Sequence, residues 1–88
     1  MIERTLTITN KLGLHARAAA KLVTLASSFK SNIELKTSTK SANGKSIMSV
    51  MMLAASKGIE VTLVINGNDE KEAVAALELL IKHRFDEE

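Results

Sequence analysis

The sequence predicts an α+β fold in which helices cover one face of an antiparallel sheet. Several short segments alternate apolar and polar side chains, which is the two-residue period of a half-buried strand. Other segments repeat apolar residues at the spacing of an amphipathic helix. Strands that are polar on one face suit an antiparallel sheet whose other face packs against helices. We therefore expect an open-faced β-sandwich of order β-α-β-β-α-β-α, with a four-stranded antiparallel sheet and its helices on one face.

The length of the chain, 88 residues, is enough for one core, and the sequence contains no internal repeat or linker. We therefore expect a single domain over residues 1–88. The clearest strand is the last, in which Val61, Leu63 and Ile65 alternate with polar residues before Asn66-Gly67 turns the chain. The predicted strands are residues 2–9, 33–37, 39–42 and 59–66.

Three segments are predicted as helices. The first is the alanine-rich segment 16–29, and the second is a short helix over 47–53 with Ser46 as its N-cap. The third follows Asp69, which forms a capping-box-like start with Glu72. The apolar residues that this last helix is expected to bury are Ala73, Leu77, Leu80, Ile81 and Phe85.

The composition excludes several kinds of chemistry. The chain has no cysteine, tryptophan or tyrosine and only two phenylalanines. Disulfides and thiolate metal sites are thereby excluded, and stacking on nucleic-acid bases has little support. A zinc site would need carboxylates around His15 and His83, and we expect neither a metal nor a cofactor. No apolar run is long enough to cross a bilayer and no signal-peptide layout is present, which predicts a cytoplasmic protein without membrane insertion.

Charge is distributed unevenly along the chain. Residues 1–58 carry nine basic and two acidic side chains, a net +7, whereas residues 59–88 carry three basic and eight acidic ones, a net −5. The positive stretch predicts a surface that attracts acidic partners. A small nucleic-acid-binding module using Lys36, Lys40 and Lys45 is an alternative. Because the chain has few aromatic residues and no concentrated basic helix, we do not expect a nucleic-acid partner.

His15 lies where a glycine loop meets the start of the first helix. The first N–H groups of a helix have no partners within it and carry a partial positive charge, which suits an anion such as phosphate. The same field disfavours a cationic imidazole, so His15 keeps a lone pair with which to accept a phosphoryl group. Arg17, in the first helical turn, is suited to bind phosphate oxygens. A plain helix cap and a solvated charge would also explain these two residues.

Two motifs make the chain resemble the HPr family, the histidine phosphocarriers of the bacterial phosphotransferase system. Gly13-Leu14-His15-Ala16-Arg17 matches the family's phosphorylation site. Asn43-Gly44-Lys45-Ser46-Ile47-Met48 matches the segment around its regulatory serine, and Leu53, Ala54 and Lys57-Gly58 continue the match. Length and element order also agree, so the resemblance covers essentially the whole chain.

The resemblance implies an HPr-like phosphocarrier that is not an enzyme. His15 would accept a phosphoryl group on Nδ1 from enzyme I, which takes it from phosphoenolpyruvate, and would pass it to an enzyme IIA-type domain. Arg17 and the backbone N–H groups of Ala16 and Arg17 would hold the phosphoryl oxygens. Where an HPr kinase/phosphorylase exists, Ser46 would be phosphorylated. We expect the carrier to be a monomer.

The short helix after Ser46 carries more apolar side chains than a helix of its length can bury. Met48 and Met51 suit a transient interface, because thioether side chains are flexible and adapt to different surfaces. In the family, this helix and the histidine site form one docking face. The expected partner-binding residues are Ala20, Thr24, Ile47, Met48 and Met51.

Two questions of function stay open at the level of sequence. Many sugar-branch members have proline at the position of Ala18, and the wording Ala18-Ala19-Ala20-Lys21 looks more like the nitrogen-branch relative NPr and the HPr proteins of some proteobacteria. A purely regulatory protein that binds partners through the Ser46 helix, with His15 silent, is an alternative function. Small acyl-phosphate hydrolases share this size and class but would release phosphate.

Overall fold

The computed structural model describes residues 1–86, and these residues follow the element order that the sequence predicts. A short 3₁₀ turn, Arg84–Asp86, follows the last helix. The elements are β1 (Ile2–Thr7), α1 (Ala16–Ser27), β2 (Asn32–Lys36), β3 (Ser41–Asn43), α2 (Ile47–Met52), β4 (Glu60–Asn66) and α3 (Glu70–Lys82).

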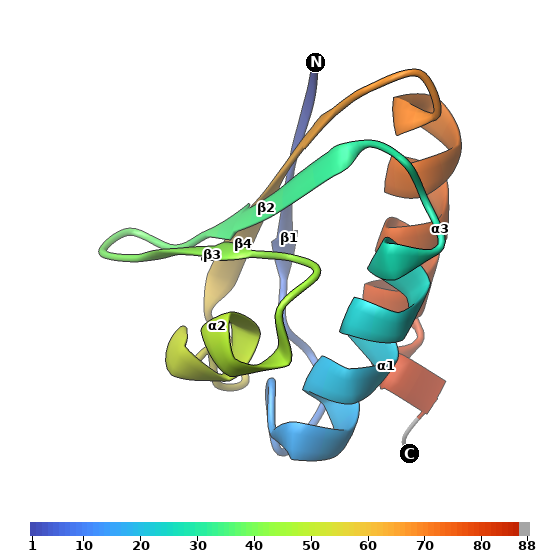
Figure 1. The fold of residues 1–88 in the computed structure, drawn as a ribbon. Coiled ribbons are helices and arrows are strands. Elements are labelled where there is room, and N and C mark those ends of the chain that lie inside the picture. The colour runs from blue at the N-terminus through green and yellow to red at the C-terminus, as the bar shows by residue number, and fades with distance from the viewer. Residues whose placement is uncertain (87–88) are drawn as a thin grey trace.

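The four strands form one sheet in the order β1-β4-β2-β3, and every neighbouring pair is antiparallel. In β4, one of the two inner strands, Ile65 pairs with Ile2 of β1 on one side and with Ile33 of β2 on the other. Figure 1 shows α1 and α3 standing together against the sheet, with α2 beside the start of α1. The predicted open-faced sandwich is confirmed.

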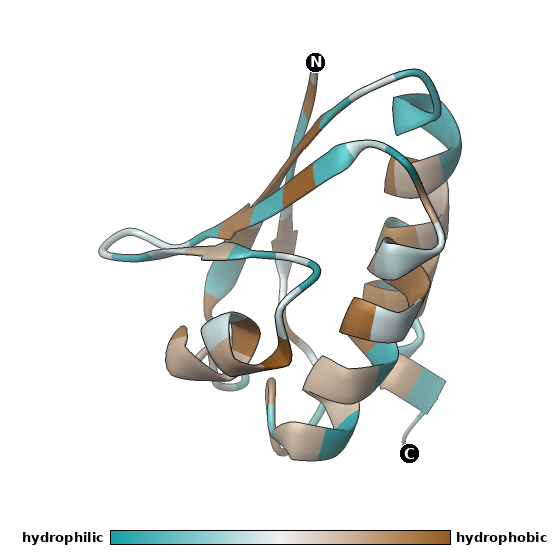
Figure 2. Ribbon diagram, viewed as in Figure 1, coloured by the Kyte–Doolittle hydropathy of each residue, from teal (hydrophilic) through white to brown (hydrophobic). Residues whose placement is uncertain are grey.

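The core lies between the sheet and the helices because the strands alternate as predicted. Val61, Leu63 and Ile65 of β4 are fully buried, whereas Thr62 and Val64 between them are partly exposed on the open face. Small side chains on α1 allow close packing against α2 and α3. Figure 2 shows apolar residues (brown) alternating with polar ones (teal) along β2. The buried helical residues are Ala18, Ala19, Leu22, Val23, Ala26, Val50, Ala73, Val74, Leu77 and Ile81.

The end of the last helix differs from the prediction. The helix ends at Lys82, and the next residues adopt left-handed backbone angles, with φ of 55° at Arg84 and 56° at Phe85. This reversal turns the Phe85 ring back into the core, where it is fully buried. Lys21 Nζ donates a hydrogen bond of 2.7 Å to the Phe85 carbonyl, which ties the turn to α1. Phe85 is therefore a core residue, but not a helical one, and Leu80 is only half-buried.

The capping box predicted at Asp69 is wrong. Asp69 is the N-cap residue of α3, yet its side chain makes no hydrogen bond to the helix. Its carboxylate instead accepts from the backbone N–H groups of Lys30 and Ser31, at 2.8 and 3.0 Å, and from the Ser31 hydroxyl. Glu70, rather than Glu72, reaches back to accept from the Gly67 N–H at 3.1 Å. The turn between α1 and β2 therefore binds this carboxylate in place of the helix.

No helix within residues 1–86 has the length and apolar character that a membrane span requires.

Candidate functional site

The loop before α1 is fixed by close backbone packing. Gly13 has φ of +67°, and a Cβ built there would lie 2.5 Å from the carbonyl oxygen of Ala55. The next N–H group, that of Leu14, donates to the same oxygen at 2.8 Å. Asn10 Nδ2 donates to the Gly13 carbonyl at 2.7 Å. Only glycine fits this position, because any side chain would meet both steric clash and left-handed strain.

His15 is the N-cap of α1, in an extended conformation with φ of −75° and ψ of 178°. Its Nδ1 accepts a hydrogen bond of 3.3 Å from the Arg17 N–H. An acceptor carries a lone pair, so in the neutral ring the proton lies on Nε2. The Nδ1 lone pair is therefore directed at the start of the helix, where the first N–H groups lack acceptors within the helix.

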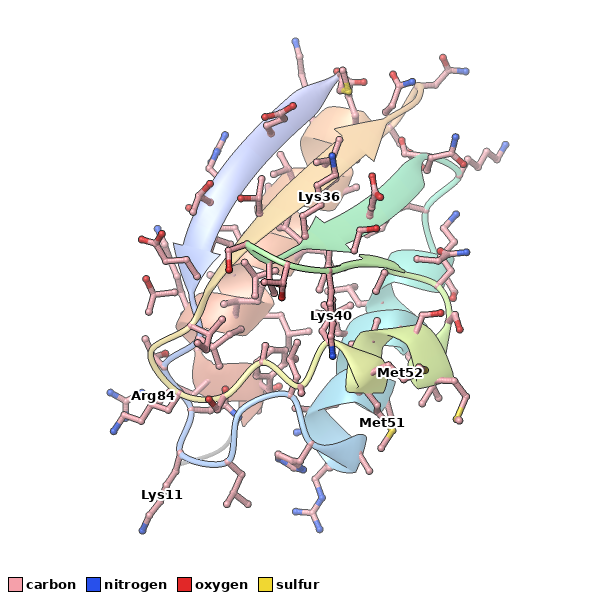
Figure 3. All side chains as sticks on the ribbon, turned by 90° about the vertical axis from the view of Figure 1, so that its left-hand side faces the viewer. Lys11, Lys36, Lys40, Met51, Met52 and Arg84 are labelled. Atoms are coloured by element: carbon pink, nitrogen blue, oxygen red, sulfur yellow. The ribbon has the colours of Figure 1, made fainter. Side chains whose placement is uncertain are left out.

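The surface around His15 is a hollow of about 840 Å³ whose charged lining residues are mainly cationic. Arg17 and Lys11 are exposed there, and Asp86 adds one carboxylate from the C-terminal turn. Cations beside a helix N-terminus favour a multiply charged oxyanion. Figure 3 shows Lys11 projecting from this end of the molecule. The lining residues are Lys11, Leu12, His15, Ala16, Arg17, Lys21 and Asp86.

Ser46 is the N-cap of α2, as its position in the sequence predicts. Its backbone is extended, and its Oγ accepts a hydrogen bond of 3.3 Å from the Ser49 N–H. The hydroxyl is half-buried. The cap explains the serine structurally, because it satisfies one of the N–H groups left over at the helix start.

The two helices that carry the predicted docking residues are neighbours. α2 packs against α1 near its beginning, so residues 30 positions apart share one region of the surface (Figure 1). On α2, Ile47 is 42% exposed, Met48 70% and Met51 39%. On α1, Ala20 and Thr24 line a mostly apolar hollow of about 650 Å³ that also touches Leu80 of α3.

Besides the predicted partner-binding residues, two further exposed apolar side chains lie on the elements that carry the candidate site. Leu12, which is 69% exposed, lies in the hollow next to His15. Met52, also 69% exposed, lies at the end of α2 (Figure 3), where Lys40 Nζ donates to its carbonyl oxygen at 3.2 Å. The spacing of Met48 and Met52, four residues apart on a helix, was the sequence signal that could have identified Met52.

No group of three metal-ligating side chains comes together within residues 1–86. The site offers instead one imidazole, one guanidinium and the N–H groups of a helix start. These groups can bind an oxyanion such as phosphate and present a nucleophilic ring nitrogen to it.

Comparison with known proteins identifies the family. The family model described as "PTS HPr component phosphorylation site" matches residues 2–83. The phosphocarrier protein HPr of Xylella fastidiosa (strain Temecula1) is 53% identical over 88 residues, covering 100% of this chain and 99% of that protein. The phosphocarrier protein HPr of Cupriavidus necator is also 53% identical, over 99% of this chain and 98% of its own. This chain belongs to the HPr family of phosphocarrier proteins of the phosphotransferase system.

Solved structures of the family share the fold. The crystal structure of HPr-C-His from Thermoanaerobacter tengcongensis has a TM-score of 0.96 and 49% identity, covering 100% of this chain and 99% of that one. An HPr dimer from the same organism has a TM-score of 0.79 and 48% identity, covering 99% of this chain and 100% of that one. Membership of the family establishes a general role in phosphotransfer through a phosphohistidine.

Proposed function

We propose that His15 is the phosphorylated residue, accepting a phosphoryl group on Nδ1 from enzyme I that has been charged by phosphoenolpyruvate. The observation that carries this proposal is the hydrogen bond from the Arg17 N–H to His15 Nδ1. It marks Nδ1 as the ring atom with the lone pair and directs that lone pair toward the start of α1, where the first N–H groups have no acceptor within the helix.

In the transfer, a bond forms between His15 Nδ1 and phosphorus. The bond from phosphorus to its donor atom breaks, and the electron pair stays with the donor. The Arg17 N–H then loses its imidazole acceptor and, with the N–H of Ala16, donates to phosphoryl oxygens instead. The Arg17 guanidinium lies in the same hollow and adds charge-assisted hydrogen bonds. The reverse steps pass the group to an enzyme IIA-type domain.

The proposal is tested by incubating the protein with phosphoenolpyruvate and enzyme I. We expect an acid-labile, base-stable phosphoprotein that is lost in His15→Ala. His83→Ala is the matched control, because His83 is the second histidine and lies exposed at the end of α3. Retention of label in His15→Ala would refute the assignment.

The docking surface for these partners comprises Ala20, Thr24, Ile47, Met48 and Met51. Its support is the exposure of the apolar α2 side chains beside the cationic hollow, which would match a partner that is acidic around an apolar patch. Replacing Met48, which is 70% exposed and bears no core packing, by aspartate should raise the KM for transfer from enzyme I while leaving folding intact.

Ser46 is proposed as a regulatory site for an HPr kinase/phosphorylase. A phosphate at the start of α2 would be stabilised by the helix, yet would set about two negative charges beside an acidic partner. Docking should weaken without unfolding. Mass spectrometry after incubation with such a kinase and ATP tests this, and absence of phosphoserine counts against it.

The second candidate is a purely regulatory protein that binds partners through the Ser46 helix, with His15 silent. The apolar side chains of α2 are exposed and could bind a partner without phosphorylation of His15. The distinguishing measurement is transfer from phosphorylated His15 to an enzyme IIA, in either the sugar or the nitrogen branch.

We further propose that the carrier is one domain over residues 1–88 and works in the cytoplasm. We also propose that it is a monomer, which sedimentation in solution would check.

A further inference from the structure

The oxidisable side chains of this protein are concentrated on one short helix. The chain has four methionines and no cysteine, tryptophan or tyrosine. Met1 is one of the four, and the other three lie on or at the end of α2, which is six residues long. Because thioethers are then the side chains that peroxides attack most readily, oxidant chemistry is directed to α2.

The three α2 methionines differ in exposure. Met48 and Met52 are 70% and 69% exposed, whereas Met51 is 39% exposed. Val50 and the C-cap residue Leu53 are buried and anchor α2 to the core. Burying the exposed thioethers instead would require α2 to rotate and expose these two side chains. Figure 3 shows Met51 on the side of α2 toward α1 and Met52 at the helix end.

We propose that Met48 and Met52, and more slowly Met51, are oxidation sites whose conversion to sulfoxide weakens docking of phosphotransferase partners. With hydrogen peroxide as oxidant, the thioether sulfur attacks one peroxide oxygen. A sulfur–oxygen bond forms as the oxygen–oxygen bond breaks, giving methionine sulfoxide and water. Sulfur loses the two electrons that the peroxide gains. This inference rests on the proposed function, since Met48 and Met51 belong to the docking surface proposed above and Met52 follows Met51 on the same helix.

The effect on docking follows from polarity. A sulfoxide is a polar hydrogen-bond acceptor on a side chain that was apolar, and burying it against an apolar partner surface leaves it without a donor. The modification adds no charge and changes neither His15 nor Arg17. Oxidation should therefore raise the KM for the charged partner and leave kcat unchanged.

The test treats the folded protein with hydrogen peroxide, removes the peroxide by gel filtration and maps sulfoxides by tandem mass spectrometry. Met1, which is 73% exposed and far from the docking surface, is the internal reference for a solvent-exposed thioether. We expect Met48 and Met52 to react about as fast as Met1, and Met51 more slowly. Transfer of phosphoryl label from enzyme I should then show a KM raised about tenfold, the effect of one unpaired polar group in an interface.

Two variants isolate the cause. Combined Met48→Leu, Met51→Leu and Met52→Leu keeps the surface apolar and should make transfer insensitive to peroxide. Met1→Leu, the matched control, should stay as sensitive as the wild type. The inference is overturned if the fully oxidised wild type keeps the KM of the untreated protein. It is also overturned if peroxide raises the KM of the triple variant as much as that of the wild type, or if Met48 and Met52 react far more slowly than Met1. Failure of the untreated wild type to accept label overturns the proposed function and this regulation together, which distinguishes the two cases.

Discussion

Two helices of this protein, α1 and α3, begin in opposite ways. The first turn of α3 contains Glu70 and Glu72, whereas the first turn of α1 contains no acidic residue and has Arg17 instead. Glu70 accepts from the Gly67 N–H, so the positive start of α3 is neutralised by the chain itself. The start of α1 is capped by the His15 imidazole and has no such carboxylate. The phosphate site proposed above therefore depends as much on the acidic side chains absent from this first turn as on the residues present in it.

Breaking the loop before α1 should have the largest effect. Gly13→Ala combines left-handed strain with a clash against the Ala55 carbonyl, for a loss of about 3 kcal/mol of unfolding free energy. Phosphoryl acceptance should fall with it, because the loop positions His15. Urea unfolding and labelling by enzyme I measure the two effects.

Gly58→Ala is the control for that prediction. Gly58 also has a positive φ, of 93°, but a Cβ there meets nothing within 4 Å. It should lose only the strain component, about 1 kcal/mol. Equal destabilisation of the two variants would show that the contact with Ala55 is unimportant.

Making the start of α1 resemble that of α3 should separate stability from function. In Arg17→Glu, an acid in the first turn stabilises the helix by about 0.5 kcal/mol, yet repels the incoming phosphoryl group. We expect acceptance to fall about 100-fold, since a charge-assisted hydrogen bond is replaced by a repulsion. Phosphoryl acceptance by Arg17→Gln should lie between that of the wild type and that of Arg17→Glu. A stable Arg17→Glu variant with normal transfer would contradict the comparison.

Relieving the strain next to the site should have a smaller effect. Ala54 has φ of 54°, a left-handed conformation that glycine adopts without steric cost. Ala54→Gly should raise the unfolding free energy by about 1 kcal/mol and leave phosphoryl transfer unchanged. Thermal melting measures the first and labelling the second. A lower melting temperature would indicate that Ala54 is not strained.

The smallest effect is expected at the other helix start and depends on pH. Hydrogen bonds from the Ser31 hydroxyl and from the Lys30 N–H hold the pKa of Asp69 below its ordinary value. Ionised Asp69 therefore stabilises the fold above the unfolded-state pKa of about 4, and this stabilisation is lost as the pH falls through the lower folded-state value. Asp69→Asn should flatten the decline in melting temperature with acid.

Glu72→Gln is the control for Asp69→Asn, because it removes one charge from the same helical turn at an exposed position. It should keep the acid dependence of the wild type. Identical profiles for all three proteins would show that the Asp69 hydrogen bonds are not coupled to folding.

The sequence predicted what depends on local periodicity and failed where distant groups compete. Alternation placed Val61, Leu63 and Ile65 in the core, and the position of Ser46 before an apolar run predicted its cap. Asp69 was assigned to its own helix, because nothing local shows that the N–H groups of Lys30 and Ser31 lie within reach. Phe85 fits the helical period of α3, and only the tertiary contact with Lys21 shows that the backbone reverses first.

The candidate site was likewise predictable only where it depends on local sequence. The junction of a glycine loop with a helix start predicted where His15 lies, and the family resemblance implied the role that is proposed for it above. The support beneath it, from Ala55 to Gly13 and Leu14, joins residues about 40 positions apart and has no signature in either segment. Asp86 enters the hollow only because the C-terminal turn reverses the chain.

The same turn decides how the carrier can be joined to other proteins. The amino group of Met1 bonds Glu70 at the start of α3, whereas Asp86 lies beside His15 at the opposite end of the molecule (Figure 1). A bulky group attached to the Asp86 side chain would therefore lie beside His15, at the proposed phosphoryl site, and compete with docking partners. A tether attached to the Met1 amino group lies at the far end, so an immobilised carrier should be attached there.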